Sequence, residues 1–189
     1  MQTNRKVLFI IEVALFSAIA VILDFFSFKA WGQGGSISLQ MVPIFIMSFR
    51  WGWRGGLSTG LIFGLLQLVM GAYIIHPFQA VLDYPLAFTA VGCAAITAQP
   101  IKRSLKNNHK TKMILFILLG CFIGSFARLI SHNLSAMIYF GASAPANQPV
   151  WLYATIYNVS YILPSFVLSV LVLILLIQTR TQIIENKHN

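Results

Sequence analysis

The chain has 189 residues, of which 58% are hydrophobic and only 9% are charged, and its mean hydropathy is +0.79. Soluble domains carry about a quarter charged residues, so a chain this apolar cannot cover a water-facing surface and most of it must face lipid. The composition therefore excludes a soluble globular protein. It predicts an all-α integral membrane protein, folded as a single membrane domain over residues 1–189.

Six apolar segments are expected to cross the lipid bilayer. Helices are expected because an unpaired backbone is too costly in lipid, and a helical span needs about 20 residues. The second segment is short and is interrupted by Pro43, which predicts a short or broken helix, whereas the fifth is long enough to span with tilt. In chain order the predicted spans are 7–26, 37–49, 56–75, 80–98, 113–140 and 151–177.

The basic residues predict the orientation of these six transmembrane helices. The formal net charge is +9, and eleven Lys and Arg residues fall on one side of the membrane against Lys29 alone on the other. Because cytoplasmic loops carry an excess of Lys and Arg, both termini are expected to be cytoplasmic. The basic residues lie in short, separate connections, so they do not indicate a nucleic-acid partner.

Polar side chains inside membrane spans are the default functional candidates. Asp83 lies near the outer end of the fourth segment, and Asn158 lies in the outer third of the sixth. Arg128 and His132 are four residues apart in the fifth segment and therefore share one helix face. Together with nearby tyrosines, these side chains fall at a similar depth, on the side away from the basic connections.

Such a group of residues suits a flat, cationic, heteroaromatic ligand. Aromatic ring faces attract cations, and a partly desolvated carboxylate adds Coulomb attraction that is unavailable in water. Arg128 could hold a phosphate or a carbonyl, or fix the orientation of Asp83. A purely structural alternative is also open, in which Asp83 and Arg128 form an interhelical ion pair and the tyrosines form an interfacial belt.

Catalytic and metal-binding motifs do not appear in the sequence. It contains no H-E-x-x-H, no G-x-S-x-G and no P-loop, and its four histidines lack metal-ligand spacing. We therefore expect no enzyme, no bound metal and no cofactor. An autonomous, ion-coupled secondary transporter remains an alternative, although no clear inverted repeat supports it.

Three stretches of the sequence resemble the thiamine-binding S components of energy-coupling factor (ECF) transporters. They are GAYIIHPFQAVLDYPLAF at residues 71–88, R-x-x-x-H-x-x-S from Arg128, and YATIYN from Tyr153. The resemblance covers essentially the whole chain and implies a vitamin-binding subunit in the cell membrane. Such a subunit captures thiamine at the outer face and docks on a transmembrane coupling protein with two ATPase subunits. An S component for another vitamin remains an alternative.

The resemblance also implies roles for individual residues. By resemblance, Asp83 corresponds to the family's binding acid, Tyr84 to the tyrosine beside it and Tyr73 to the family's loop tyrosine. In the fifth segment, His132 and Arg128 correspond to the family's histidine and basic residue. In the sixth segment, Tyr153 and Asn158 correspond to the family's tyrosine and asparagine. This sequence has Asp at position 83 and Arg at position 128, where the best-known member of the family has Glu and Lys. The family's stacking Trp appears here as Phe140, so Trp31 or Trp151 in the outward loops could supply a ring instead.

Small residues at helical spacing form two stripes. Residues four apart on a helix allow another helix to approach closely. By resemblance, Ala14 and Ala18 in the first segment are expected to meet the coupling protein. Gly56, Gly60 and Gly64 have the same spacing and are expected to pack the third helix internally.

Overall fold

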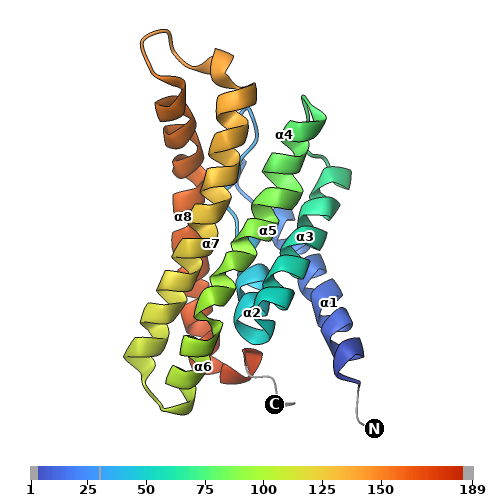
Figure 1. Ribbon diagram of the computed structural model, residues 1–189, viewed down its shortest axis with the longest axis vertical. Helices are drawn as coiled ribbons and strands as arrows, with labels where there is room; N and C mark the ends of the chain where they lie inside the picture. The colour runs from blue at the N-terminus through green and yellow to red at the C-terminus, as the bar shows by residue number, and fades with distance from the viewer. Residues whose placement is uncertain (1–3, 30, 185–189) are drawn as a thin grey trace.

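The computed structural model describes residues 4–29 and 31–184, and over these residues it consists of six helical rods (Figure 1). Five of the rods are regular helices, and the fourth, residues 77–106, contains two irregular turns. The regular helices are α1 (Arg5–Phe25), α2 (Met41–Trp51), α3 (Trp53–Val69), α7 (Lys110–Tyr139) and α8 (Val150–Thr179). The fourth rod comprises α4 (Pro77–Val81), a π-helical turn (Leu82–Leu86), α5 (Ala87–Val91), a 3₁₀ turn (Gly92–Thr97) and α6 (Ala98–Lys106).

This architecture agrees with the predicted all-α membrane protein of six helices. In the described part of the chain, four helical stretches are long and apolar enough to cross a bilayer: α1, the fourth rod, α7 and α8. The start of α1 and the end of α8 lie at the same end of the bundle as α6 (Figure 1). The connection between α7 and α8 lies at the opposite end, which we call the outer end.

Three predicted helix ends were wrong. The second helix begins at Met41 rather than at residue 37, because Ile37 pairs with Phe28 in an isolated antiparallel bridge. The third helix ends at Val69 instead of continuing to residue 75. The fourth continues to Lys106, about two turns beyond the predicted end at residue 98.

The short second helix is continuous, so the predicted interruption at Pro43 does not occur. Pro43 is the third residue of α2. In the first turn of a helix a proline is tolerated, since the N–H that it lacks would have no partner within the helix. All of the residues from Met41 to Phe49 are buried, so α2 forms the centre of the bundle and is shielded from lipid by its neighbours.

The glycine stripe of α3 packs against the fourth rod, as expected. A Cβ atom added at Gly60 would collide with the carbonyl of Phe88, and one added at Gly64 would collide with the backbone at Tyr84 and Pro85. These glycines therefore hold the fourth rod close to α3. This close packing fixes the backbone that carries Asp83.

Helix α1 presents a largely exposed surface. Its buried residues are only Val13, Ser17 and Ala20, whereas Ala14 and Ala18 are exposed on the other face. In the half of α1 away from the outer end, Glu12 accepts hydrogen bonds from Arg50 Nε and Nη2 (2.6 Å each) and from Trp51 Nε1 (2.6 Å). This ion pair fastens α1 to the end of α2.

Candidate functional site

A cavity of about 190 Å³ lies toward the outer end of the bundle. Its walls come from the outer ends of α1 and α3, the connection between α1 and α2, the segment around Tyr73, the fourth rod, α7 and α8. Nine of the ten residues predicted to bind a ligand line this cavity. They are Trp31, Tyr73, Asp83, Tyr84, Arg128, His132, Phe140, Tyr153 and Asn158.

Trp151 is the predicted residue that the structure does not bring to the cavity. It lies in the first turn of α8 and is 60% exposed. Of the two tryptophans considered as alternatives to the family's stacking ring, only Trp31 lines the cavity. Its indole Nε1 donates to Ser160 Oγ (2.7 Å), and its ring meets the edge of Tyr161 at 5.7 Å between centroids.

The local sequence explains why Asp83 faces the cavity. Pro85 has no N–H to give to the carbonyl four residues earlier, and its ring crowds that carbonyl, so a regular helix is disfavoured here. The chain forms a π-helical turn at Leu82–Leu86 instead. Such turns occur frequently at functional sites because they alter the direction of the side chains within them. Asp83 and Tyr84 both belong to this turn.

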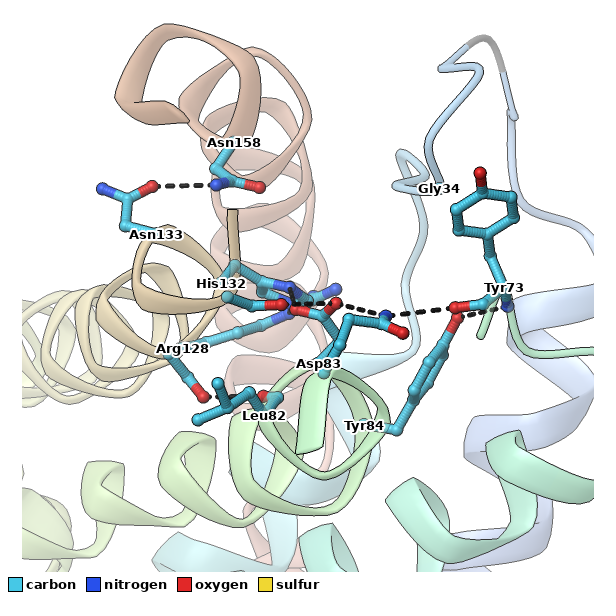
Figure 2. A network of polar contacts seen from close by, with 12 residues as sticks. Gly34, Tyr73, Leu82, Asp83, Tyr84, Arg128, His132, Asn133 and Asn158 are labelled. Carbon is cyan, nitrogen blue, oxygen red and sulfur yellow. Dashed lines mark hydrogen bonds and ion pairs between the residues drawn. The ribbon is translucent and has the colours of Figure 1, made fainter. Parts of the chain in front are cut away.

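The carboxylate of Asp83 is held by three neighbours (Figure 2). Its Oδ2 accepts hydrogen bonds from Gln79 Nε2 (2.6 Å) and Ser135 Oγ (2.9 Å), and its Oδ1 lies 3.1 Å from His132 Nδ1. These donors fix the orientation of the charged group, so its position is set without a ligand.

Arg128 and Asp83 interact through His132. Arg128 Nε donates to His132 Nε2 at 3.1 Å. Because this nitrogen accepts, the imidazole proton belongs on Nδ1, where it is donated to Asp83. In the described part of the chain, the direct Asp83–Arg128 ion pair considered from the sequence is replaced by this bridge through a neutral histidine.

The Arg128 side chain is only 3% exposed and lies over the ring of Phe88, with Cζ 4.5 Å from the ring centroid. Its Nη1 atom has no hydrogen-bond partner among the residues that the structure describes. A buried donor without a partner is costly. Arg128 is therefore a candidate donor to a ligand atom that accepts a hydrogen bond.

Aromatic side chains form the wall beside Asp83. The Tyr84 hydroxyl accepts a hydrogen bond from Tyr73 N (2.7 Å), and the Tyr73 ring stacks on Phe140 with centroids 6.2 Å apart (Figure 2 shows Tyr73 and Tyr84). Gln79 supports this wall, because its Nε2 also donates to the carbonyl of Tyr73 (3.1 Å). One buried amide thus orients both the acid and the tyrosine.

Helix α8 closes the other side of the cavity. Asn158 Nδ2 donates to Asn133 Oδ1 (2.8 Å), and its Oδ1 accepts from the Tyr161 hydroxyl. The Tyr153 hydroxyl donates to Gln33 Oε1 (3.2 Å), which joins α8 to the connection between α1 and α2. Asn158 and Tyr153 are therefore held in place by hydrogen bonds to α7, to α8 itself and to the connection between α1 and α2.

Several lining residues were missed by the sequence analysis. Asp24 is an acid inside a predicted span, so the rule that selected Asp83 also applies to it. Gln79 lies four residues before Asp83, and this helical spacing was a usable signal. No spacing rule indicates Gln40, which reaches the cavity because the connection before α2 folds back along α8. The other missed lining residues include Gln33, Gln67 and Phe88, whereas Tyr157 and Tyr161 belong to the tyrosines expected near Asn158.

The geometry favours binding over catalysis. The cavity combines fixed acids, one buried guanidinium and several rings, which suits a small aromatic cation. Among the described residues no group of three or more His, Cys, Asp or Glu side chains could hold a metal ion.

Comparison with known proteins agrees with this architecture. The profile of the family described as thiamine transporter protein matches residues 10–185. The chain is 40% identical over 189 residues to thiamine transporter ThiT of Bacillus subtilis, covering 98% of each chain. It is 28% identical over 191 residues to thiamine transporter ThiT of Lacticaseibacillus paracasei, covering 99% of this chain and 95% of the relative.

Solved structures share the fold. The structure of ThiT from Listeria monocytogenes superposes with a TM-score of 0.89 at 27% identity, covering 96% of this chain and 99% of that one. The S component of a bacterial ECF transporter superposes with a TM-score of 0.62 at 16% identity, covering 96% and 100%, which shows a shared fold. The resemblance found in the sequence is confirmed: this multi-pass membrane protein belongs to the thiamine transporter family.

Proposed function

We propose that the chain is the substrate-binding S component of an ECF-type importer and that it binds thiamine in the outer cavity. The observation that carries this proposal is the Asp83 carboxylate, which three hydrogen bonds fix in an aromatic-walled cavity. Family membership supports thiamine as the ligand.

The proposed recognition follows from the charges and rings of the cavity. Thiamine carries a permanent positive charge on its thiazolium ring, which Asp83 attracts. Its aminopyrimidine ring offers flat faces to Tyr73 and Phe140 and hydrogen-bonding edges to polar neighbours. Arg128 Nη1, which has no partner among the described residues, donates to an acceptor atom of the ligand. Trp31, Tyr84, His132, Tyr153 and Asn158 complete the proposed binding wall.

Delivery of thiamine to the cell interior requires a partner in this proposal. The chain has no P-loop, so a separate module of one transmembrane coupling protein and two ATPase subunits supplies the energy. Ala14 and Ala18 form the docking stripe, which their exposure on α1 supports. Small residues there let a partner helix approach closely.

We further propose that both termini are cytoplasmic and that residues 1–189 act as one domain. The end of the bundle where α1 begins and α8 ends carries most of the basic residues, including Arg5, Arg50 and Lys102. Such an excess is typical of the cytoplasmic side.

Thiamine titration of the purified protein in detergent tests the binding proposal. Trp31 lines the cavity, so saturating thiamine should change the intrinsic tryptophan fluorescence, and the Trp31→Phe variant should lose most of this change. Riboflavin, a vitamin of different shape and charge, serves as the control ligand and should produce no saturable change. A protein that responds to riboflavin and ignores thiamine would contradict the proposal.

A further inference from the structure

A second acid, Asp24, also lines the cavity. It belongs to the last turn of α1, and its side chain is only 16% exposed. Its charged neighbour is Lys29, whose Nζ lies 3.8 Å from Asp24 Oδ2 and whose side chain is 63% exposed. Solvent screens such an exposed partner, so Lys29 offsets only part of the charge that Asp24 presents to the cavity.

Gln40 joins Asp24 to Arg128. With its amide oriented so that both polar atoms are satisfied, Gln40 donates to Asp24 Oδ1 (2.6 Å) and accepts from Arg128 Nη2 (3.3 Å). The Gln40 side chain is buried and lines the cavity. Arg128 therefore reaches Asp24 through a neutral amide, as it reaches Asp83 through the neutral His132.

The charges of this network do not cancel. The network holds two carboxylates and one guanidinium, while His132 and Gln40 are neutral, so its net charge is −1. Lys29 also lines the cavity, but its ammonium group is largely exposed to solvent. Without Asp24, the positive charge of Arg128 would offset part of the attraction that Asp83 exerts on a cation, although His132 separates the two residues. Charge interactions in a partly desolvated site are stronger than in water, so this difference matters for a singly charged ligand.

We propose that Asp24 is a second binding carboxylate, which makes the cavity net negative and thereby selects a monocation. This inference rests on the proposed binding of thiamine. Asp83 and Asp24 act on the ligand charge from two walls of the cavity. Arg128 is linked to both acids through neutral side chains and offers Nη1 to an acceptor atom of the ligand.

The test compares Asp24→Asn with wild-type protein, using thiamine and an uncharged analogue in which a neutral ring replaces the thiazolium. Asp24→Asn is expected to bind thiamine about tenfold more weakly and the uncharged analogue as tightly as wild type does. Asp24→Glu, which keeps the charge, should restore most of the thiamine affinity. Equal weakening for both ligands would reveal a merely structural role, and unchanged thiamine affinity would also overturn the inference.

A second variant keeps the test decisive if Asp24→Asn does not yield folded protein. Lys29→Gln removes the exposed cation beside Asp24, so it should tighten thiamine binding about twofold and leave binding of the uncharged analogue unchanged. Unchanged or weaker thiamine binding by this variant would contradict the role of Asp24. Failure of the proposed function is distinguishable, because wild-type protein itself would then not bind thiamine.

Discussion

His132 Nδ1 lies 3.1 Å from Asp83 Oδ1, while the other ring nitrogen of His132 accepts a hydrogen bond from Arg128. The histidine thus separates the acid from the nearest buried cation with a neutral ring. Direct contact with Arg128 would leave Asp83 less able to attract a positively charged ligand. This separation explains how a site for a cation can contain a buried arginine.

Replacing His132 should disturb both of its partners. In His132→Leu, Arg128 Nε and Asp83 Oδ1 each lose a hydrogen bond in a buried environment, which typically costs about 1–3 kcal/mol. We expect thiamine affinity to fall roughly tenfold or more and the melting temperature in detergent to decrease. Gln at this position can accept from Arg128 and donate to Asp83, so His132→Gln should recover part of both losses. Equal behaviour of the two variants would argue against the bridging role.

Gln79 is only 1% exposed, and its amide bonds Asp83, the Tyr73 carbonyl and Ile75 N. The variant Gln79→Leu keeps a similar volume but removes all three hydrogen bonds. We expect faster thiamine dissociation, because both the acid and the wall at Tyr73 lose their support, with a loss of affinity of about tenfold. Stopped-flow fluorescence measures the dissociation rate. An unchanged rate would show that Asp83 and Tyr73 are positioned without Gln79.

Much of the fold was predictable from the sequence, because six apolar segments in a chain of this composition leave few alternatives to a helical membrane protein. Helix ends were less predictable. Residues 70–75 are apolar enough to continue α3, yet they leave the helix, and the Tyr73 and Ile75 backbones bond to Tyr84 and Gln79. Such tertiary contacts have no local sequence signal.

The candidate site was predictable where its residues share one helix. Arg128 and His132 are four residues apart, and the structure places them in one network with Asp83. The contribution of Asp24 was harder to predict, because it reaches Arg128 through Gln40, far away in the sequence. The sequence offered Trp31 and Trp151 as alternative rings, and only tertiary structure separates them: Trp31 lines the cavity, whereas Trp151 is exposed in the first turn of α8.

A bulky residue on the exposed stripe of α1 should separate binding from transport. Ala14→Trp or Ala18→Trp is expected to abolish thiamine uptake by cells, because the added ring prevents close approach of the coupling protein. Thiamine binding by the purified variants should be unchanged, because Ala14 and Ala18 are exposed and do not line the cavity.

Leu171→Trp is the matched control, because it adds the same ring to an exposed position of α8 and should leave uptake normal. Equal loss of uptake in this control would indicate a general effect on membrane insertion. Loss of binding in the α1 variants would place their effect on internal packing.

The proposed orientation can be tested with topology reporters. A reporter fused to the C-terminus should be cytoplasmic, and one inserted near Ala146, in the connection between α7 and α8, should be external. The reason is the excess of Lys and Arg at the end of the bundle that contains α6. The reverse pattern would contradict the proposed entry of thiamine from the outer face.

The negative charge of Asp83 is expected to attract the positively charged ligand. Asp83→Asn keeps the shape of the side chain and removes its negative charge. Loss of one partner from a charge-assisted contact in a buried site typically costs about 2–5 kcal/mol, and each 1.4 kcal/mol is tenfold in affinity. If the acid served only to neutralise Arg128, the double variant Asp83→Asn, Arg128→Gln would recover stability and binding. We expect no recovery of binding, because His132 separates the two residues.

Equilibrium titration of wild-type protein and Asp83→Asn with thiamine, followed by tryptophan fluorescence in detergent, is the most direct measurement. We predict saturable binding by the wild type and at least about thirtyfold weaker binding by the variant. A melting curve of each protein should show that Asp83→Asn remains folded. Unchanged thiamine affinity in the folded variant would contradict the assignment of Asp83 as the residue that attracts the ligand.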